Sequence, residues 1–397
     1  MDDQEQIPRI FPYDEDNDEE DNEEDDDEDI DNENEDANNL DRQSDSDEEI
    51  VFLMGMANDF IQHAARILQR RNRNPPVPFA IFNLNQYDNI TSERLFRFRT
   101  DEILDIVEAL RVPNVLVLDN GSKFSSLEGV CIVLRRLAFP CRLVDLMPMF
   151  GRSEGMLSRI FNKTITWIYN RWARQLFTWD HARLTPAKLE QFAAVIREAG
   201  SPLQDVVGFI DGTVRPIARP MENQRQEYNG HHRVHAMKFQ AVTTPDGIVV
   251  HLSGPYHGKQ HDTAMYRISR LQDTLLERVK DVAGNNMCIF GDQGYELSPV
   301  LQVAFPGRDN ELTAGQRAFN KAMAEVRIAV EWSFGHTLQY FSFTELKKTQ
   351  RSLLSALHVQ YTISVLFANL HSCITQKNAS VGKFGLSPPT LEEYLHD

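Results

Sequence analysis

Long apolar stretches and export signals are missing from this 397-residue sequence. No apolar run approaches the roughly 18 residues that a membrane-spanning helix needs, and the N-terminus lacks the charged-then-apolar pattern of a signal peptide. The four cysteines form no CxxC pair, which argues against a zinc knuckle and for a reducing compartment. We therefore expect a soluble, intracellular protein with no membrane partner.

Nucleotide-binding loops and convincing histidine sites are missing as well. No Walker or GxGxxG pattern occurs. The cluster His231, His232 and His235 has no companion cysteines for zinc. The pair His261–Asp262 resembles the dyad of an HD-type metal phosphohydrolase, but the distant histidines are not spaced to fit that chemistry. The sequence therefore argues against P-loop, dinucleotide and zinc chemistry.

Negative charge is concentrated at one end of the chain. Residues 1–49 contain 26 of the 59 acids and only two of the 41 bases. The rest holds 33 acids and 39 bases, so its formal charge is +6 although the whole protein has −18. A mildly basic body can bind a polyanion. Residues 1–50 offer almost nothing to bury and are predicted to be a disordered acidic tail.

Helical periodicity dominates residues 91–180, where we expect an all-α domain after a helix and linker over 51–90. Thr100 is a candidate N-cap of the helix TDEILDIVEALRV. Leu143 to Phe150 predict a short helix, followed by a tight turn at Gly151 and Arg152. Ser153 then caps a second helix, and this order is typical of a helix-turn-helix.

Polar side chains on the second of these helices are candidate DNA contacts. Ser158, Arg159 and Asn162 face away from its apolar stripe and are residue types that read DNA grooves. Arg152 in the turn joins them. The alternative is an ordinary helical packing domain, because helix-turn-helix spacing alone is a weak signal.

From about residue 200 the apolar period changes from 3.6 to 2, which indicates strands. The segments that show it are VVGFIDGTVRPI, VHAMKFQAVTTPDG, IVVHLSGPYHG and MCIFGDQGY. TPDG is expected to be a hairpin turn between the second and third. Helical patterns follow, so we expect a mixed α/β domain over 200–345 and a C-terminal helix and tail over 346–397.

Four acids stand where neither a solvated loop nor a core explains them well. Asp211 and Asp292 are each predicted to end a strand, and Asp262 follows the third strand. Glu331 lies among apolar neighbours inside a helix, where an unpartnered buried glutamate would be neutralised. Converging carboxylates repel one another, and a hard divalent cation with oxygen ligands, Mg²⁺ or Mn²⁺, relieves the repulsion.

Each acid also has a simpler explanation when it is taken alone. Asp211 can form a turn with the next glycine, and Asp262 can cap a helix. Glu331 can pair with Arg327 at i, i+4. Taken jointly, the four favour a two-metal site of the kind that stabilises both the attacking and the leaving oxygen in a phosphodiester displacement.

The sequence resembles a known family over residues 205–340. The blocks FIDGTVRPIARP, YNGHHRVHAMKFQAV, IFGDQGYEL and FNKAMAEVRIAVEWSFG resemble, in this order, those of the PIF/Harbinger transposases and the related Harbinger-derived nuclease. The helix-turn-helix and the C-terminal FGLSPPTLEEYL resemble that family too. The resemblance implies a ribonuclease H-like mixed sheet with flanking helices and catalysis of the DDE type.

Site residues follow from this resemblance position by position. It implies metal ligands at four acids, namely Asp211, Asp262, Asp292 and Glu331. It implies a catalytic triad of Asp211, Asp292 and Glu331, with Asp262 as the alternative second acid. Four bases are candidates for gripping DNA phosphate near this centre, namely Arg215, Arg233, Lys238 and Lys259.

These observations predict a divalent-metal-dependent DNA nuclease or transposase that cleaves phosphodiester bonds. The resemblance alone implies that it also joins them and that it works with a separately encoded Myb-like DNA-binding partner. A nuclear location follows from DNA as the substrate. Either a monomer or a homo-oligomer is compatible with the sequence. Two alternatives are a domesticated DNA- or chromatin-binding protein that keeps the fold without catalysis, and a hydrolase of small phosphate esters.

Overall fold

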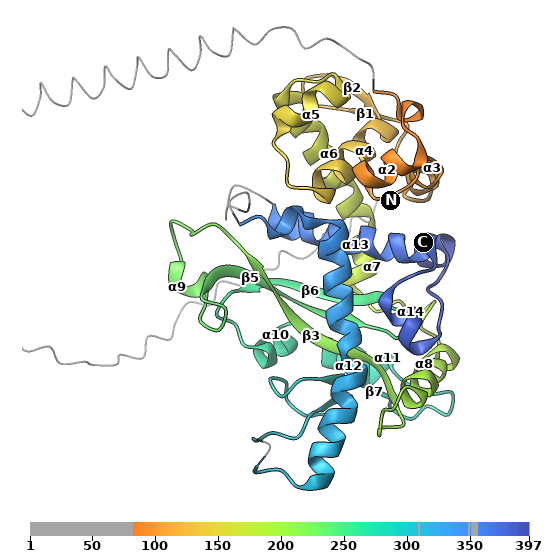
Figure 1. Ribbon diagram of the computed structural model, residues 1–397, viewed down its shortest axis with the longest axis vertical. Coiled ribbons are helices and arrows are strands. Elements are labelled where there is room, and N and C mark those ends of the chain that lie inside the picture. The colour runs from red at the N-terminus through yellow and green to blue at the C-terminus, as the bar shows by residue number, and fades with distance from the viewer. Residues whose placement is uncertain (1–81, 309, 348–349, 351–355, 397) are drawn as a thin grey trace, which may run out of the picture. The chain divides into compact units, whose positions relative to one another are not determined.

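The computed structural model of the chain describes residues 82–308, 310–347, 350 and 356–396 (Figure 1). These residues belong to one compact unit, residues 76–397. The described residues do not include the predicted acidic tail over 1–50. They include only residues 82–90 of the predicted helix and linker over 51–90. None of the helices in the described ranges is long and apolar enough to cross a membrane.

The first part of the described chain is mainly helical. Its elements are η1 (Leu84–Gln86), α2 (Asn89–Phe96), α3 (Thr100–Ala109), α4 (Ser126–Ala138), α5 (Leu143–Phe150), α6 (Glu154–Trp172), α7 (Arg174–Phe177) and α8 (Pro186–Glu198). Helix α4 is buried along almost its whole length and packs on α6, whose Leu157, Ile160 and Ile168 are inaccessible. Burial of this apolar stripe is what holds the helices together.

The prediction of an all-α domain over 91–180 is wrong at one place. Strands β1 (Val115–Val117) and β2 (Lys123–Ser125) form an antiparallel hairpin between α3 and α4. The cause is local: a β-branched run precedes a turn in which Gly121 has a φ of 78°. A three-residue strand is too short to show a period of two clearly.

The predicted boundaries of the helix, turn and second helix at residues 143–172 are confirmed. Gly151 ends α5 with a φ of 61°, and Ser153 Oγ accepts a hydrogen bond from the Met156 amide at 3.4 Å. The predicted cap of α3 is wrong by one residue. Arg99 is the N-cap there, because its amide donates to the Glu102 carboxylate at 2.8 Å.

The second part of the chain is built on a mixed sheet. Its strands are β3 (Val206–Pro216), β4 (Tyr228–Asn229), β5 (Val234–Thr243), β6 (Val249–His257), β7 (Cys288–Gly291) and β8 (Leu301–Val303). Strand β3 pairs antiparallel with β5 and parallel with β7. Strand β6 flanks β5, while β8 flanks β7. The TPDG turn between β5 and β6 is confirmed, with Gly247 at a φ of 79°.

Helices cover both faces of this sheet. On one face, α8, α12 (Ala314–Tyr340) and α14 (Ala379–Phe384) enclose an apolar cluster that includes Phe209, Phe290 and Val330. The other face is covered by α10 (Asp262–Ile268) and α11 (Leu271–Arg278). Figure 1 shows α12 as a long helix that crosses the sheet. The predicted mixed α/β architecture is therefore confirmed.

The C-terminal region packs back onto this domain. It contains η2 (Ser342–Glu345), the almost wholly buried α13 (Leu357–Thr375), α14 and α15 (Leu391–Tyr394). The short helix α9 (Gln224–Glu227) precedes β4. Helix α13 contacts both α6 and α12, so one buried helix joins the helical part to the sheet part.

Candidate active site

Asp211 lies on β3, and Asp292 directly follows β7, the neighbouring parallel strand. Phe209 of β3 is in register with Phe290 of β7, and each acid stands two residues further along its chain. Because side chains alternate along a strand, each acid shares the face of its phenylalanine, which is the face covered by α12. The fold therefore places both carboxylates next to each other beneath this helix.

The expectation that Asp211 ends its strand is wrong. Strand β3 continues to Pro216, and Asp211 pairs with Ala241 of β5 in an unbroken antiparallel register. Gly212 is therefore not a turn residue. A Cβ at Gly212 would lie 2.7 Å from Asp262 Oδ1, so glycine is required because another side chain approaches closely.

Asp262 reaches this point from the opposite face of the sheet. It is the first residue of α10, and its Oδ2 would lie 3.3 Å from a Cβ at Gly294. The same Cβ would lie 3.1 Å from Asp292 Oδ1. Two glycines, one on β3 and one after β7, thus leave the space in which Asp262 comes close to the strand acids.

Glu331 approaches from α12 and is linked to Asp211 by a shared base. Arg327 Nη1 lies 3.0 Å from Asp211 Oδ2, and its Nη2 lies 3.3 Å from Glu331 Oε1. The interpretation of Glu331 as a buried glutamate among apolar neighbours of its helix is wrong, because its side chain is 55% exposed. The buried face of α12 is formed by Val326, Val330 and their neighbours.

Lys238 of β5 neutralises Asp262. Its Nζ lies 2.7 Å from Asp262 Oδ1 and 2.9 Å from the carbonyl oxygen of Gln260. Lys238 is only 8% exposed, so this ammonium group is enclosed by its partners. The four acids are therefore accompanied by two basic side chains, one buried and one at the surface of α12.

Burial dominates the electrostatics of the site. It raises the pKa of Asp211 to about 6, with Asp292 adding to the rise while Arg327 and the Gly212 amide oppose it. The neighbouring Tyr295 is 4% exposed, and burial together with Asp262, Asp211 and Asp292 raises its pKa well above the ordinary value. The close approach of Asp262 and Asp292 to the same point at Gly294 agrees with this common electrostatic environment.

The donor set suits a hard divalent cation, because every acid offers carboxylate oxygen. Backbone amides already orient two of the groups: Gly212 N–H donates to Asp211 Oδ1 at 2.8 Å, and Gly294 N–H donates to Asp292 Oδ1 at 2.9 Å. Among the described residues, no three acids, histidines or cysteines are assembled as a ready ligand cluster. Arg327 and Lys238 instead occupy carboxylate oxygens that a metal would need.

Two of the predicted phosphate-gripping bases are not at the surface. Arg215 is 7% exposed, donates to Thr213 Oγ1 at 2.7 Å and stacks on Tyr361. Lys238 is buried against Asp262, as described above. Arg233 and Lys259 are exposed, so their charges are available to solvent.

The predicted DNA contacts in the helical part also divide into two kinds. Arg159 and Asn162 are exposed on α6, and Ser158 is half-buried. Arg152 is held by Glu128 through two bonds of 2.8 and 3.0 Å, which fixes the start of α6 to α4. Its guanidinium therefore has a partner within the fold.

Two contributors to the site did not emerge from the sequence. Arg327 was recognised only as an i, i+4 partner of Glu331, a pairing that is confirmed, whereas its bond to Asp211 joins residues 116 positions apart. Tyr295 lies in the motif GDQGY, but nothing in the sequence showed that three of the acids would raise the pKa of its buried hydroxyl. Signals of this kind come from tertiary contact.

Comparison with protein families gives one match. Residues 210–368 match the model of the DDE superfamily endonucleases. The matched segment contains all four acids and covers less than half of the chain. No curated protein and no solved structure matches the chain. The family match supports a DDE transposase-type nuclease domain.

Proposed function

We propose that this protein is a divalent-metal-dependent DNA nuclease of the PIF/Harbinger transposase type, with residues 200–345 as its catalytic domain. One observation carries the proposal. Asp211 on β3 and Asp292 directly after the parallel strand β7 stand side by side in the sheet, and Arg327 links Asp211 to Glu331 on α12, all within the matched segment. The sheet order β6-β5-β3-β7-β8, with β5 antiparallel to its neighbours, supports a ribonuclease H-like fold.

In this proposal Asp211, Asp292 and Glu331 hold the metal, with Asp262 completing the set of acids. When bound, divalent ions would activate the attacking oxygen and stabilise charge on the leaving oxygen of a phosphodiester. The protein itself positions the carboxylates. The Gly212 and Gly294 amides fix one oxygen of each strand acid, so the two carboxylates are oriented before any ligand arrives.

DNA is the proposed substrate, and its further contacts are proposals of the same kind. Arg233 and Lys259 in the sheet part, and Arg159 and Asn162 on α6, are exposed and have the chemistry to contact DNA. A nuclear location and a Myb-like partner are supported only by the family resemblance. Joining of DNA ends, as opposed to cleavage, has the same support.

The test is nicking of supercoiled plasmid DNA in millimolar Mg²⁺. We expect Asp211→Asn, Asp292→Asn and Glu331→Gln to abolish nicking, and EDTA to abolish it in the wild type. Glu325→Gln is the matched control, because Glu325 is an exposed acid on the same helix. Full nicking by Asp211→Asn would contradict the proposal. Turnover of small phosphate esters without nicking would point instead to an esterase.

A second candidate is a non-catalytic DNA- or chromatin-binding protein. It is favoured by one observation, namely that Arg327 and Lys238 form ion pairs with two acids of the site. This candidate predicts that the full-length protein binds DNA but takes up no Mn²⁺. A calorimetric titration with Mn²⁺ therefore separates the two functions.

A further inference from the structure

The two bases at the acidic centre differ in how firmly they are held. Lys238 is enclosed, and its ammonium has two partners, the Asp262 carboxylate and the Gln260 carbonyl. The Lys238 side chain is 10% exposed and that of Asp262 is 23% exposed, so removing the ammonium would leave a largely covered carboxylate without its base. Burial of an unpaired charge is costly, so Lys238 is a permanent member of the fold.

Arg327 is held more loosely. Its side chain is 20% exposed, it projects from the surface of α12, and one of its two partners, Glu331, is 55% exposed. Both bonds of its guanidinium go to acids of the site. Rotation of this side chain into water would break those two bonds and would leave the Asp211 carboxylate, which is only 18% exposed, in need of another cation.

Arg327 also lies between two carboxylates, a position that favours a cation. It forks between an acid of the sheet and an acid of the helix, and joins Asp211 to Glu331. Asp211 Oδ1 already accepts the Gly212 amide, so Oδ2, the atom that Arg327 contacts, is the oxygen left for a metal. A guanidinium and a metal ion cannot both use that oxygen in full.

We propose that Arg327 is the resident counter-cation of this site and that a divalent metal ion replaces it between Asp211 and Glu331. This inference rests on the proposed function, because it assumes that these acids bind metal. The monovalent guanidinium stabilises the metal-free protein. A divalent ion attracts the same carboxylates more strongly, and Arg327 then turns outward from α12 while Lys238 stays in place.

The experiment is a calorimetric titration of the full-length protein with Mn²⁺ in the absence of DNA. Arg327→Gln removes the competitor, and we expect its affinity for Mn²⁺ to rise about tenfold. An arginine within about 4–6 Å lowers the pKa of a carboxyl group by roughly 1–3 units, and its positive charge should oppose the binding of a metal ion in the same direction. Arg327→Lys keeps the charge, but a single ammonium cannot fork between two carboxylates. We expect that variant to bind roughly threefold more tightly than the wild type.

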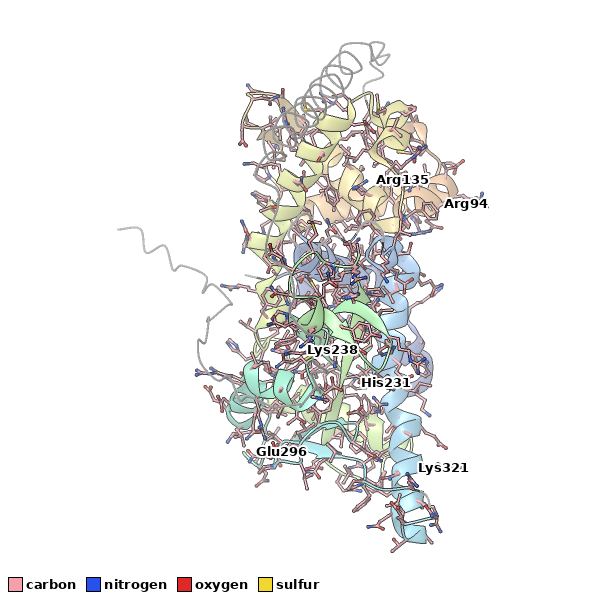
Figure 2. All side chains as sticks on the ribbon, turned by 90° about the vertical axis from the view of Figure 1, so that its left-hand side faces the viewer. Arg94, Arg135, His231, Lys238, Glu296 and Lys321 are labelled. Atoms are coloured by element: carbon pink, nitrogen blue, oxygen red, sulfur yellow. The ribbon has the colours of Figure 1, made fainter. Side chains whose placement is uncertain are left out.

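Lys321→Gln is the matched control, because Lys321 is an exposed base nearer the start of α12 (Figure 2). Its affinity for Mn²⁺ should stay within about twofold of the wild type, as expected for a screened surface charge. Thermal melts give a second readout. In EDTA, Arg327→Gln should melt below the wild type because Asp211 loses its partner, and saturating Mn²⁺ should raise its melting temperature more than that of the wild type.

Two results would overturn the exchange. If a folded Arg327→Gln binds Mn²⁺ no more tightly than the wild type, Arg327 does not compete with the metal, although the proposed function stands. If Arg327→Lys matches the wild type while Arg327→Gln is tighter, the effect comes from charge alone and the fork is not displaced. Absence of Mn²⁺ binding in every variant, including the wild type, would instead remove the proposed function itself.

Discussion

The helical part and the sheet part of this protein each contain an arginine bound to carboxylates, and the two arrangements differ in their balance of charge. In the helical part, Arg152 makes a two-bond pair with Glu128, which is 8% exposed. In the sheet part, Arg327 divides its guanidinium between Asp211 and Glu331, with Asp292 and Asp262 nearby.

The difference shows how a structural ion pair can be told from a site. One base and one acid with matched geometry leave no unsatisfied charge, so the pair of Arg152 and Glu128 fastens α6 to α4. Four acids with two bases leave an excess of negative charge. That excess, and not any single residue, is what makes the sheet part a candidate metal centre.

The largest expected effect is on cleavage. Asp211→Asn should lower the rate of plasmid nicking by at least ~10³-fold, about 4 kcal/mol of transition-state stabilisation, because an amide is a poor ligand for a divalent ion. The counterpart in the helical part, Glu128→Gln, should leave the cleavage rate of the folded protein within a few-fold of the wild type. Equal losses in both variants would break the distinction between pair and site.

The ion pair in the helical part should matter for stability and not for cleavage. Glu128→Ala leaves Arg152 without its partner in a mostly buried position, and we expect a loss of roughly 3 kcal/mol in the free energy of unfolding. Urea denaturation measures it. Binding of Mn²⁺ by this variant should be unchanged. A loss below about 0.5 kcal/mol would show that the pair is no stronger than a surface salt bridge.

The raised pKa of Asp211 predicts a pH dependence in the metal-free protein. The folded value is about 6 and the ordinary value is 3.8, so the folded state binds this proton more tightly than the unfolded chain does. Stability from this group is therefore complete below about pH 4 and is lost as the pH rises towards 6. Between pH 4 and pH 6 we expect the free energy of unfolding of the wild type to fall by roughly 2 kcal/mol relative to that of Asp211→Asn. Urea melts in EDTA measure the difference, and a constant difference would contradict the burial of Asp211.

Substitutions at two glycines should change the free energy of unfolding in opposite directions. Gly212→Ala places a Cβ 2.7 Å from Asp262 Oδ1, and we expect a loss of about 1–3 kcal/mol because the carboxylate must move. Gly155 on α6 has open space where an added Cβ would lie. Gly155→Ala should therefore raise the free energy of unfolding by about 0.5 kcal/mol through its higher helix propensity. Thermal melts check both, and a neutral Gly212→Ala would show that Asp262 is free to shift.

Local patterns predicted most of the secondary structure and the identity of the acids. The helix boundaries at Gly151 and Ser153, the TPDG hairpin and the strands that carry Asp211 and Asp292 depend on neighbouring residues, which a single sequence displays. The hairpin of β1 and β2 was not predicted, because strands of three residues are too short to show a clear periodicity.

The roles of individual side chains were harder to predict. Gly212 was expected to make a turn and instead makes room for Asp262, and Lys238 was expected at the DNA surface and instead lies buried against the same acid. Both outcomes depend on α10 packing against the sheet. Contacts between residues distant in sequence decide them, and no spacing along the chain records such contacts.

The most direct test of the central claim is an anomalous difference map from crystals of the full-length protein grown with Mn²⁺. We predict a peak within bonding distance of the Asp211 and Asp292 carboxylates, with Glu331 turned towards it and the guanidinium of Arg327 withdrawn. A map with no peak at these acids, and with Arg327 still joining Asp211 to Glu331, would contradict the assignment of a metal centre.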